Sequence, residues 1–239
     1  MTFLGDVVNW FTNSAHWHGA SGVPHRVEEH MVMSLAAIAA AVLVAVPPSL
    51  VLGHLRRFGA LAVNISNVGR AIPSFAILVL SVQVVGIGAE PAFIALFVLA
   101  IPPLVTNSYV GMAEVDPEIR ESARGMGMTA WQSMRRVEIP VALPVLLAGL
   151  RTAAVQVVAT ATLAAIVAWG GLGRYIIDGL AQLDYVQVFA GAVLVAVLSV
   201  LTELVLALVQ RLVVSAGLGQ RHPGKNEPFV GAATTAEAT

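Results

Sequence analysis

Five apolar stretches of the chain are each long enough to cross a lipid bilayer as one helix. They run from Met31 to Gly53, Leu61 to Gly88, Pro91 to Ala113, Pro140 to Ala168 and Val186 to Leu212. A helix rises about 1.5 Å per residue, so about 20 residues cross the roughly 30 Å of hydrocarbon. Within lipid, backbone polar groups must be bonded inside the segment, which favours helices over open strands. The pattern predicts an all-α membrane protein with about five transmembrane helices.

Composition agrees with a membrane protein and excludes several other classes. Apolar residues make up 57% of the 239 residues and charged residues 11%, whereas about a quarter of a soluble domain is charged. The formal net charge of -1 gives no indication of a nucleic-acid partner. The absence of cysteine excludes disulfides and thiolate metal sites,. Four histidines precede residue 31, but without the H-E-x-x-H order,. We therefore expect no catalytic residue, no metal and no cofactor in this chain.

The distribution of Lys and Arg predicts the orientation in the membrane. If the loop after Ala113 is cytoplasmic, nine basic residues lie inside: Arg56, Arg57, Arg120, Arg124, Arg135, Arg136, Arg211, Arg221 and Lys225. Only Arg26 and Arg174 lie outside, while Arg70 and Arg151 fall within spans. Positive charges prefer the cytoplasmic side. The N-terminus is thus expected outside and the C-terminus inside the cell.

The chain divides into three parts. Residues 1–29 are expected to form an extracytoplasmic segment, where Trp10, Phe11 and Trp17 suggest a helix or loop on the membrane surface,. Residues 30–215 form the transmembrane domain, and residues 216–239 a disordered cytoplasmic tail. Within the tail, Gly219 to Lys225 matches the phosphate-loop spacing, but Asn226 stands where Ser or Thr would hold magnesium,. We therefore do not expect ATP binding there.

The loop 114–139 is the richest polar segment of the chain. Asp116, Pro117 and Glu118 are typical of a helix start, and the helix should stop at Gly125 or Gly127,. Thr129 to Gln132 has the spacing of a capping box and predicts a second short helix that ends before Pro140,. Such a helix-turn-helix can present itself to a protein partner or lie in lipid headgroups, and the residues alone favour neither.

The loop resembles the signature of the inner-membrane permeases of ABC importers. That signature reads E-A-A, three residues, G, nine residues, then I-x-L-P. Here Glu121-Ser122-Ala123, Gly127 and Val137-Glu138-Ile139-Pro140 occupy its anchors, with Ser122, Val137 and Ile139 as mild departures. Further stretches resemble osmoprotectant permeases in particular: Ile72 to Phe75, Asn107 to Tyr109, Leu147 to Ala153, Ala161 to Ala165 and Gly170 to Gly173.

The resemblance implies the type I ABC importer permease fold and a function. Two permease subunits, either two copies or two homologous chains, would enclose a path for glycine betaine, carnitine, choline or proline. A separate ATP-binding subunit would hydrolyse ATP, and an extracytoplasmic binding protein would deliver the substrate to the inner membrane. The resemblance also implies the positions that couple this chain to the ATPase: Glu121, Ser122, Ala123, Gly125, Gly127, Ile139 and Pro140. A permease for another small solute, such as an amino acid, is the first alternative.

Polar residues within the spans are the candidates for the transport path. They are Asn67, Pro73, Asn107, Tyr109, Gln156 and Thr160. Arg70 is a possible partner for Glu203, and Arg151 is expected to contact another helix. Trp169 and Tyr175 are read first as interfacial anchors and second as substrate contacts. No aromatic cage for a cation is visible, so specificity is expected in the binding protein.

Two other function classes were weighed from the same residues. An ion-coupled carrier would use membrane carboxylates, and Glu203 is the only central one,. An intramembrane hydrolase would need a base at membrane depth, and all six histidines are expected outside the spans. Both classes are therefore less favoured than a permease.

Overall fold

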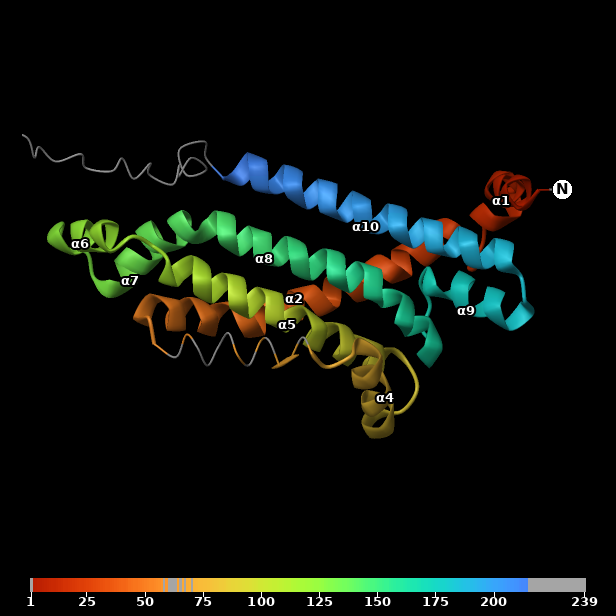
Figure 1. Cartoon of the computed structure of the whole chain (residues 1–239), viewed down its shortest axis with the longest axis horizontal. Helices are drawn as coiled ribbons and strands as arrows, with labels where there is room; N and C mark the ends of the chain where they lie inside the picture. Colours follow the sequence, from red (N-terminus) through yellow and green to blue (C-terminus); the bar gives the residue numbers. More distant parts are fainter. Residues whose placement is uncertain are drawn as a thin grey trace, which may run out of the picture.

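Four long helices lie side by side along the long axis of the molecule (Figure 1). The computed structural model describes residues 2–57, 59, 64, 66, 68–69 and 71–214. The long helices are α2 (Val23–Leu55), α5 (Ala89–Ala113), α8 (Ile139–Thr160) and α10 (Tyr185–Val213). In this bundle α2 packs on α5, α5 on α8, and α8 on α10. The described residues contain no strand, which confirms the predicted all-α class.

The second expected span is not one uninterrupted helix. Among the described residues, four helices are long and apolar enough to cross a membrane, against the five expected. Pro73 is extended, with φ -60° and ψ 130°, and α4 (Ser74–Val85) begins only after it. A proline disfavours helical geometry in the residue before it. The 12 residues of α4 rise about 18 Å, too little to cross the hydrocarbon. Part of the stretch before Pro73, including Asn67 and Arg70, lies outside the described residues.

One other expectation about the spans needs correction. The first span begins at Val23 instead of Met31, so the expected boundary at residue 30 falls inside a helix. The proline pairs 47–48 and 102–103 lie within α2 and α5, and neither pair ends its helix. Neighbouring helices in a bundle can hold a proline-containing helix together despite the lost backbone bond.

The fourth span continues without a break from the loop. Helix α7 (Ala130–Ser133) passes through the π-helical turn η2 (Met134–Glu138) into α8 and then into the 3-10 helix η3 (Ala161–Val167). The expectation that the second loop helix ends before Pro140 is therefore wrong. Proline is tolerated in the first turn of a helix, and Pro140 takes that place in α8, directly after the π turn. The segment ends at the left-handed residue Ala168, with φ 64°, as expected.

The two ends of the bundle differ. Helix α6 (Pro117–Gly125) and α7 lie at one end, and α1 (Phe3–Thr12) and α9 (Gly173–Gln182) at the other (Figure 1). Trp10 is buried at the α1 end, where its ring stacks on His16 at 4.2 Å and meets Tyr175 edge-on at 5.4 Å. Tyr175 donates a 2.6 Å hydrogen bond to the carbonyl of Ser21. Trp10 and Tyr175 therefore belong to a packed cluster and are not free membrane anchors.

Candidate functional site

The loop helix α6 has the start and the end that its residues predict. The Asp116 carboxylate accepts a hydrogen bond from the Glu118 N–H at 2.9 Å, and Pro117 takes the first helical position. After the helix, Gly127 adopts φ +77°. The N–H groups of Gly127 and Met128 donate back to the last turn, to the carbonyls of Arg124 and Ala123. A glycine in left-handed geometry is the usual way to end a helix.

The second loop helix also starts as predicted. The Thr129 hydroxyl accepts from the Gln132 N–H at 3.3 Å, and the Gln132 side chain accepts from the Thr129 N–H at 2.9 Å. These reciprocal bonds are a capping box,. The turn between α6 and α7 is thus held by local bonds at both of its sides.

Helix α6 has one buried and one exposed face. Ala123 is fully buried and Arg120 is 7% exposed, whereas Glu121, Ser122 and Gly125 are exposed. A Cβ atom added at Gly125 or Gly127 would meet no atom of the described residues within 4 Å. Large apolar side chains are exposed beside this face, with Met126 at 69% and Trp131 at 62%. The exposed face therefore has room for a partner that approaches the backbone closely.

The two motif residues at the end of the loop lie differently. Ile139 is half-buried and packs against the small apolar cluster of Met112, Val115 and Met134. Pro140 is exposed on the first turn of α8. The seven coupling candidates therefore divide into inward residues that seat the loop and outward residues on its surface.

A buried carboxylate lies beneath α6, at its contact with the bundle. Glu138 is 1% exposed. Both of its oxygens lie 2.9 Å from His54 Nδ1, and one accepts from the Ser133 hydroxyl at 2.9 Å. Arg120 Nη2 lies 3.2 Å from the other oxygen. We call these four residues, Glu138, His54, Arg120 and Ser133, the Glu138 cluster.

Arg120 extends this cluster to two backbone carbonyls. Its Nη1 donates to the carbonyl of His54 at 3.0 Å, and its Nη2 also donates to the carbonyl of Met112. Burial lowers the pKa of Arg120, and the adjacent Glu138 carboxylate acts in the opposite direction,. Next to the cluster, Arg56 donates to the carbonyl of Val115 at 2.7 Å. The cluster therefore joins α2, α5, α6, α7 and η2 at one point.

The sequence alone does not indicate the Glu138 cluster. In the sequence, Arg120 reads only as a positive charge, Glu138 as a motif position and His54 as a residue outside the expected spans. The available signal was Glu138 itself, because a carboxylate directly before a long apolar run needs a partner. No spacing rule indicates that the partners of Glu138 come from positions 54 and 120. Their proximity depends on where α2 and α6 lie relative to each other.

The transport-path candidates among the described residues do not form a single site. Asn107 is half-buried and donates to the Pro103 carbonyl at 2.8 Å, and a Cβ at Gly149 would be 2.5 Å from its own Cβ. This places Asn107 in the α5–α8 contact. Tyr109 is half-buried, with its hydroxyl against Gly59. Of the other described candidates, Pro73 and Gln156 are exposed and Thr160 is half-buried. Gln156 and Thr160 lie one turn apart on the same face of α8,.

The charged residues within the spans are only partly described. Arg151 Nε lies 3.1 Å from a Glu203 carboxylate oxygen, and Arg70, the expected possible partner of Glu203, lies outside the described residues. Arg151 also donates to the Gln210 side chain at 3.2 Å, which confirms the expected contact between helices. His30 lies within α2, is 2% exposed and is 2.8 Å from the Val158 carbonyl. Because His25, His30 and His54 all lie within α2, the expectation that every histidine lies outside the spans is wrong for these three.

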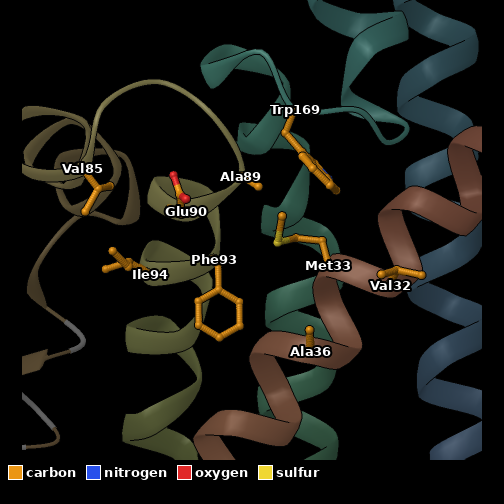
Figure 2. Close-up of a pocket in the computed structure, with 9 residues that line it drawn as sticks. All are labelled: Val32, Met33, Ala36, Val85, Ala89, Glu90, Phe93, Ile94 and Trp169. Carbon is orange, nitrogen blue, oxygen red and sulfur yellow. The ribbon is translucent and has the colours of Figure 1, made fainter.

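An apolar pocket of about 490 Å³ lies near the α1 end of the bundle, between α2 and the start of α5. Figure 2 shows Met33 from α2 and Phe93 from α5 on its walls, with Trp169 from the segment after η3 and Glu90 above Phe93. Trp169 packs against the main core, and its buried Nε1 has no hydrogen-bond partner among the described residues. Trp169 is therefore part of the bundle and not a free interfacial anchor.

Known proteins match the part of the chain that forms the helix bundle and its loop. A family model described as "binding-protein-dependent transport system inner membrane component" matches residues 32–215. The glycine betaine/carnitine/choline transport system permease protein OpuCB of Bacillus subtilis (strain 168) is 36% identical over 194 residues, which are 81% of this chain and 89% of the relative. The choline transport system permease protein OpuBB of the same organism is 37% identical, with the same shares covered.

A solved structure has the same fold. The inward-facing MetNI methionine ABC transporter in its native crystal form matches with a TM-score of 0.67 and 26% identity, covering 81% of this chain and 96% of that chain. The matched family model spans most of the chain, including all four long helices except the first turns of α2. The protein is thus a multi-pass membrane component, and it belongs to the family of inner-membrane components of binding-protein-dependent transport systems.

Proposed function

We propose that this chain is the permease subunit of an ATP-driven importer for small osmoprotectants, such as glycine betaine, carnitine, choline or proline. It carries no ATPase activity of its own and no cofactor. Its partners are an ATP-binding subunit, a second permease that is a copy or a homologue, and an extracytoplasmic binding protein.

The observation that carries the proposal is the two-faced helix α6. Its inner face is anchored by Arg120 and the fully buried Ala123, and its outer face offers Glu121 and Ser122 to a partner. A helix that only floats in headgroups does not need a buried ionic anchor, because its apolar face supplies its membrane affinity. An anchored helix can transmit a displacement from a docked ATPase into the bundle.

The placement of charge supports an orientation with α6 in the cytoplasm. Arg56 and Arg57 follow α2 at the same end of the bundle as α6 and α7, where Arg120, Arg124, Arg135 and Arg136 also lie. By the positive-inside rule this end faces the cytoplasm, with the N-terminus outside and the C-terminus inside. The arrangement predicts that a cysteine at exposed Glu118 reacts with a membrane-impermeant maleimide only in inverted vesicles.

The named activities of the relatives support the substrate class. The two relatives above are named for transport of glycine betaine, carnitine and choline. These solutes share a quaternary ammonium group, whereas the solved structure is of a methionine transporter. We therefore favour glycine betaine, carnitine and choline over proline, which has a secondary amine, and expect recognition mainly in the binding protein.

Reconstituted uptake tests this function directly. Proteoliposomes are prepared from the full chain with its ATP-binding subunit, its second permease and its binding protein. We expect labelled glycine betaine or choline to accumulate only when ATP is present on the side of the membrane where the ATP-binding subunit lies. Excess unlabelled carnitine should compete, and excess methionine should not. Competition by methionine alone would assign the chain to amino-acid uptake, and uptake driven by an ion gradient without ATP would overturn the importer assignment.

A further inference from the structure

The Glu138 cluster holds α6 to the bundle through charge, at a place where apolar packing would serve stability equally well. We propose that Glu138 is a positioning residue for transport: it makes α6 and the adjoining ends of α2, α5 and α8 move as one body. The inference rests on the proposed function, because it treats α6 as the segment that receives the ATPase. The inference adds the residues through which a movement of α6 would reach the other helices.

Burying the charges of Glu138 and Arg120 costs free energy. Moving an ion out of water costs several kcal/mol even after relaxation, and an apolar replacement of a buried pair is often as stable or more stable. Glu138 is 1% exposed and the side chain of Arg120 is 9% exposed. A charged pair here therefore indicates a requirement for defined geometry more than for stability.

The Glu138 carboxylate has three partners. Its oxygens accept hydrogen bonds from His54 and Ser133, both at 2.9 Å, and form an ion pair with Arg120 at 3.2 Å. These three partners belong to α2, α7 and α6, and Glu138 itself is the last residue before α8. Arg120 adds its bond to the carbonyl of His54 at 3.0 Å. The planar guanidinium fixes direction as well as distance, so α6 cannot turn or slide on α2 without breaking several charge-assisted bonds.

Helices α2 and α5 are in close contact beside the cluster. A Cβ at Gly53 would lie 2.6 Å from the Cβ of Met112 and 2.8 Å from the Tyr109 carbonyl oxygen. Gly53 precedes His54, and Met112 supplies a carbonyl that Arg120 binds. The helices therefore touch at backbone distance where the cluster bonds them. Packed interfaces of this kind shift between discrete arrangements and do not deform continuously.

Distance measurements on the assembled transporter test the one-body claim without disturbing the cluster. The chain contains no cysteine, so spin labels can be placed only where cysteines are introduced, at exposed Glu118 on α6 and exposed Arg57 after α2. We expect the same label-to-label distance distribution in the nucleotide-free complex and in the complex with a non-hydrolysable ATP analogue. A shift of the distribution on nucleotide binding would show that α6 moves relative to α2 and would overturn the inference.

The variant Glu138→Gln tests whether the carboxylate is needed for transmission. It keeps the side-chain shape but removes the charge that Arg120 and His54 face. We expect the variant to bind the ATP-binding subunit and the complex to hydrolyse ATP. Substrate-loaded binding protein should no longer stimulate this hydrolysis, and uptake should fall about tenfold, the size of coupling changes in such networks. Unchanged stimulation and uptake would overturn the inference.

A matched control and a charge-balanced variant separate coupling from folding. Glu28→Gln makes the same chemical change at an exposed residue of α2 near the opposite end of the bundle, and we expect wild-type uptake. Arg120→Gln with Glu138→Gln removes both buried charges, so neither ion is left unpaired. We expect this double variant to assemble with the ATP-binding subunit and still to lack stimulation. Recovery of wild-type uptake would show that the ionic bonds are dispensable. If neither cluster variant assembles, the label distances in the wild-type background decide.

The wild-type complex distinguishes the two levels of the proposal. If the unaltered chain binds no ATP-binding subunit, or if its uptake does not need ATP, the proposed function fails. If the unaltered complex imports substrate with ATP but the labels move apart or Glu138→Gln transports normally, only the role of the Glu138 cluster fails.

Discussion

Gly127 offers the sharpest test of how the loop meets its partner. The residue has φ +77°, and within the described part of the chain a Cβ there would meet no atom within 4 Å. The cost of a side chain within this protein is therefore the backbone term alone, roughly 1–2 kcal/mol for Ala in left-handed geometry and less for Asn or Asp. A folded bundle tolerates a loss of that size in an exposed turn.

We accordingly expect Gly127→Asp to give a folded, membrane-inserted permease that no longer transports. The added carboxylate would project into the space that a docked ATP-binding subunit occupies. The assays are membrane insertion, co-purification with that subunit and uptake in proteoliposomes. Gly127→Asn carries nearly the same volume without the charge and shows whether bulk alone is sufficient.

Gly125→Ala is the comparison within the same loop. Gly125 is the last residue of α6 and has helical geometry, so alanine should stabilise the helix by roughly 0.5–1 kcal/mol. Loss of transport in this variant would show that Gly125 also needs a bare backbone against the partner. Normal transport by Gly127→Asp with the ATP-binding subunit attached would refute the assignment of Gly127 to the docking surface.

Three further predictions concern local structure. Gly53→Ala should lower the thermal stability of the detergent-solubilised permease by about 1–3 kcal/mol, because its Cβ would lie 2.6 Å from that of Met112,; an unchanged melting temperature would contradict the close α2–α5 contact. Thr129→Ala removes the capping-box acceptor and should cost about 1 kcal/mol, seen as faster hydrogen exchange confined to α7. Glu203→Leu alone leaves Arg151 without its carboxylate, so it should reduce the yield of folded protein more than Glu203→Leu combined with Arg151→Leu; equal yields would show that the pair is not buried from water in the membrane.

The local features of the loop could be predicted from sequence, because they depend on neighbours in the chain. The Asp116 cap, the turn at Gly127 and the Thr129 capping box each involve residues within a few positions of one another. The third and fifth spans were also predicted closely, since uninterrupted apolar runs set their length. The docking role of Glu121, Ser122, Ala123, Gly125, Gly127, Ile139 and Pro140 stays a prediction.

The contacts between distant segments could not be predicted in the same way. The bond from His54 to Glu138 joins residues 84 positions apart, and it depends on where α2 ends relative to η2. Arg151 was assigned to a contact between helices, yet its partner Glu203 depended on the α8–α10 packing. Pro140 is expected from the sequence to mark a boundary between two helices. The π turn before it keeps the helix continuous, and sequence rules do not predict such a turn.

The uninterrupted helix from Ala130 to Val167 has a consequence for the far side of the bilayer. Its 38 residues make a rod about 57 Å long. A tilt of about 5° around the midpoint would shift each tip by about 2.5 Å, in opposite directions. If the ATP-binding subunit displaced the helix near Ala130, the segment around Trp169 would therefore move in the opposite direction. The extracytoplasmic end of the bundle would then respond through a rigid tilt of this helix, without a relay through side-chain contacts.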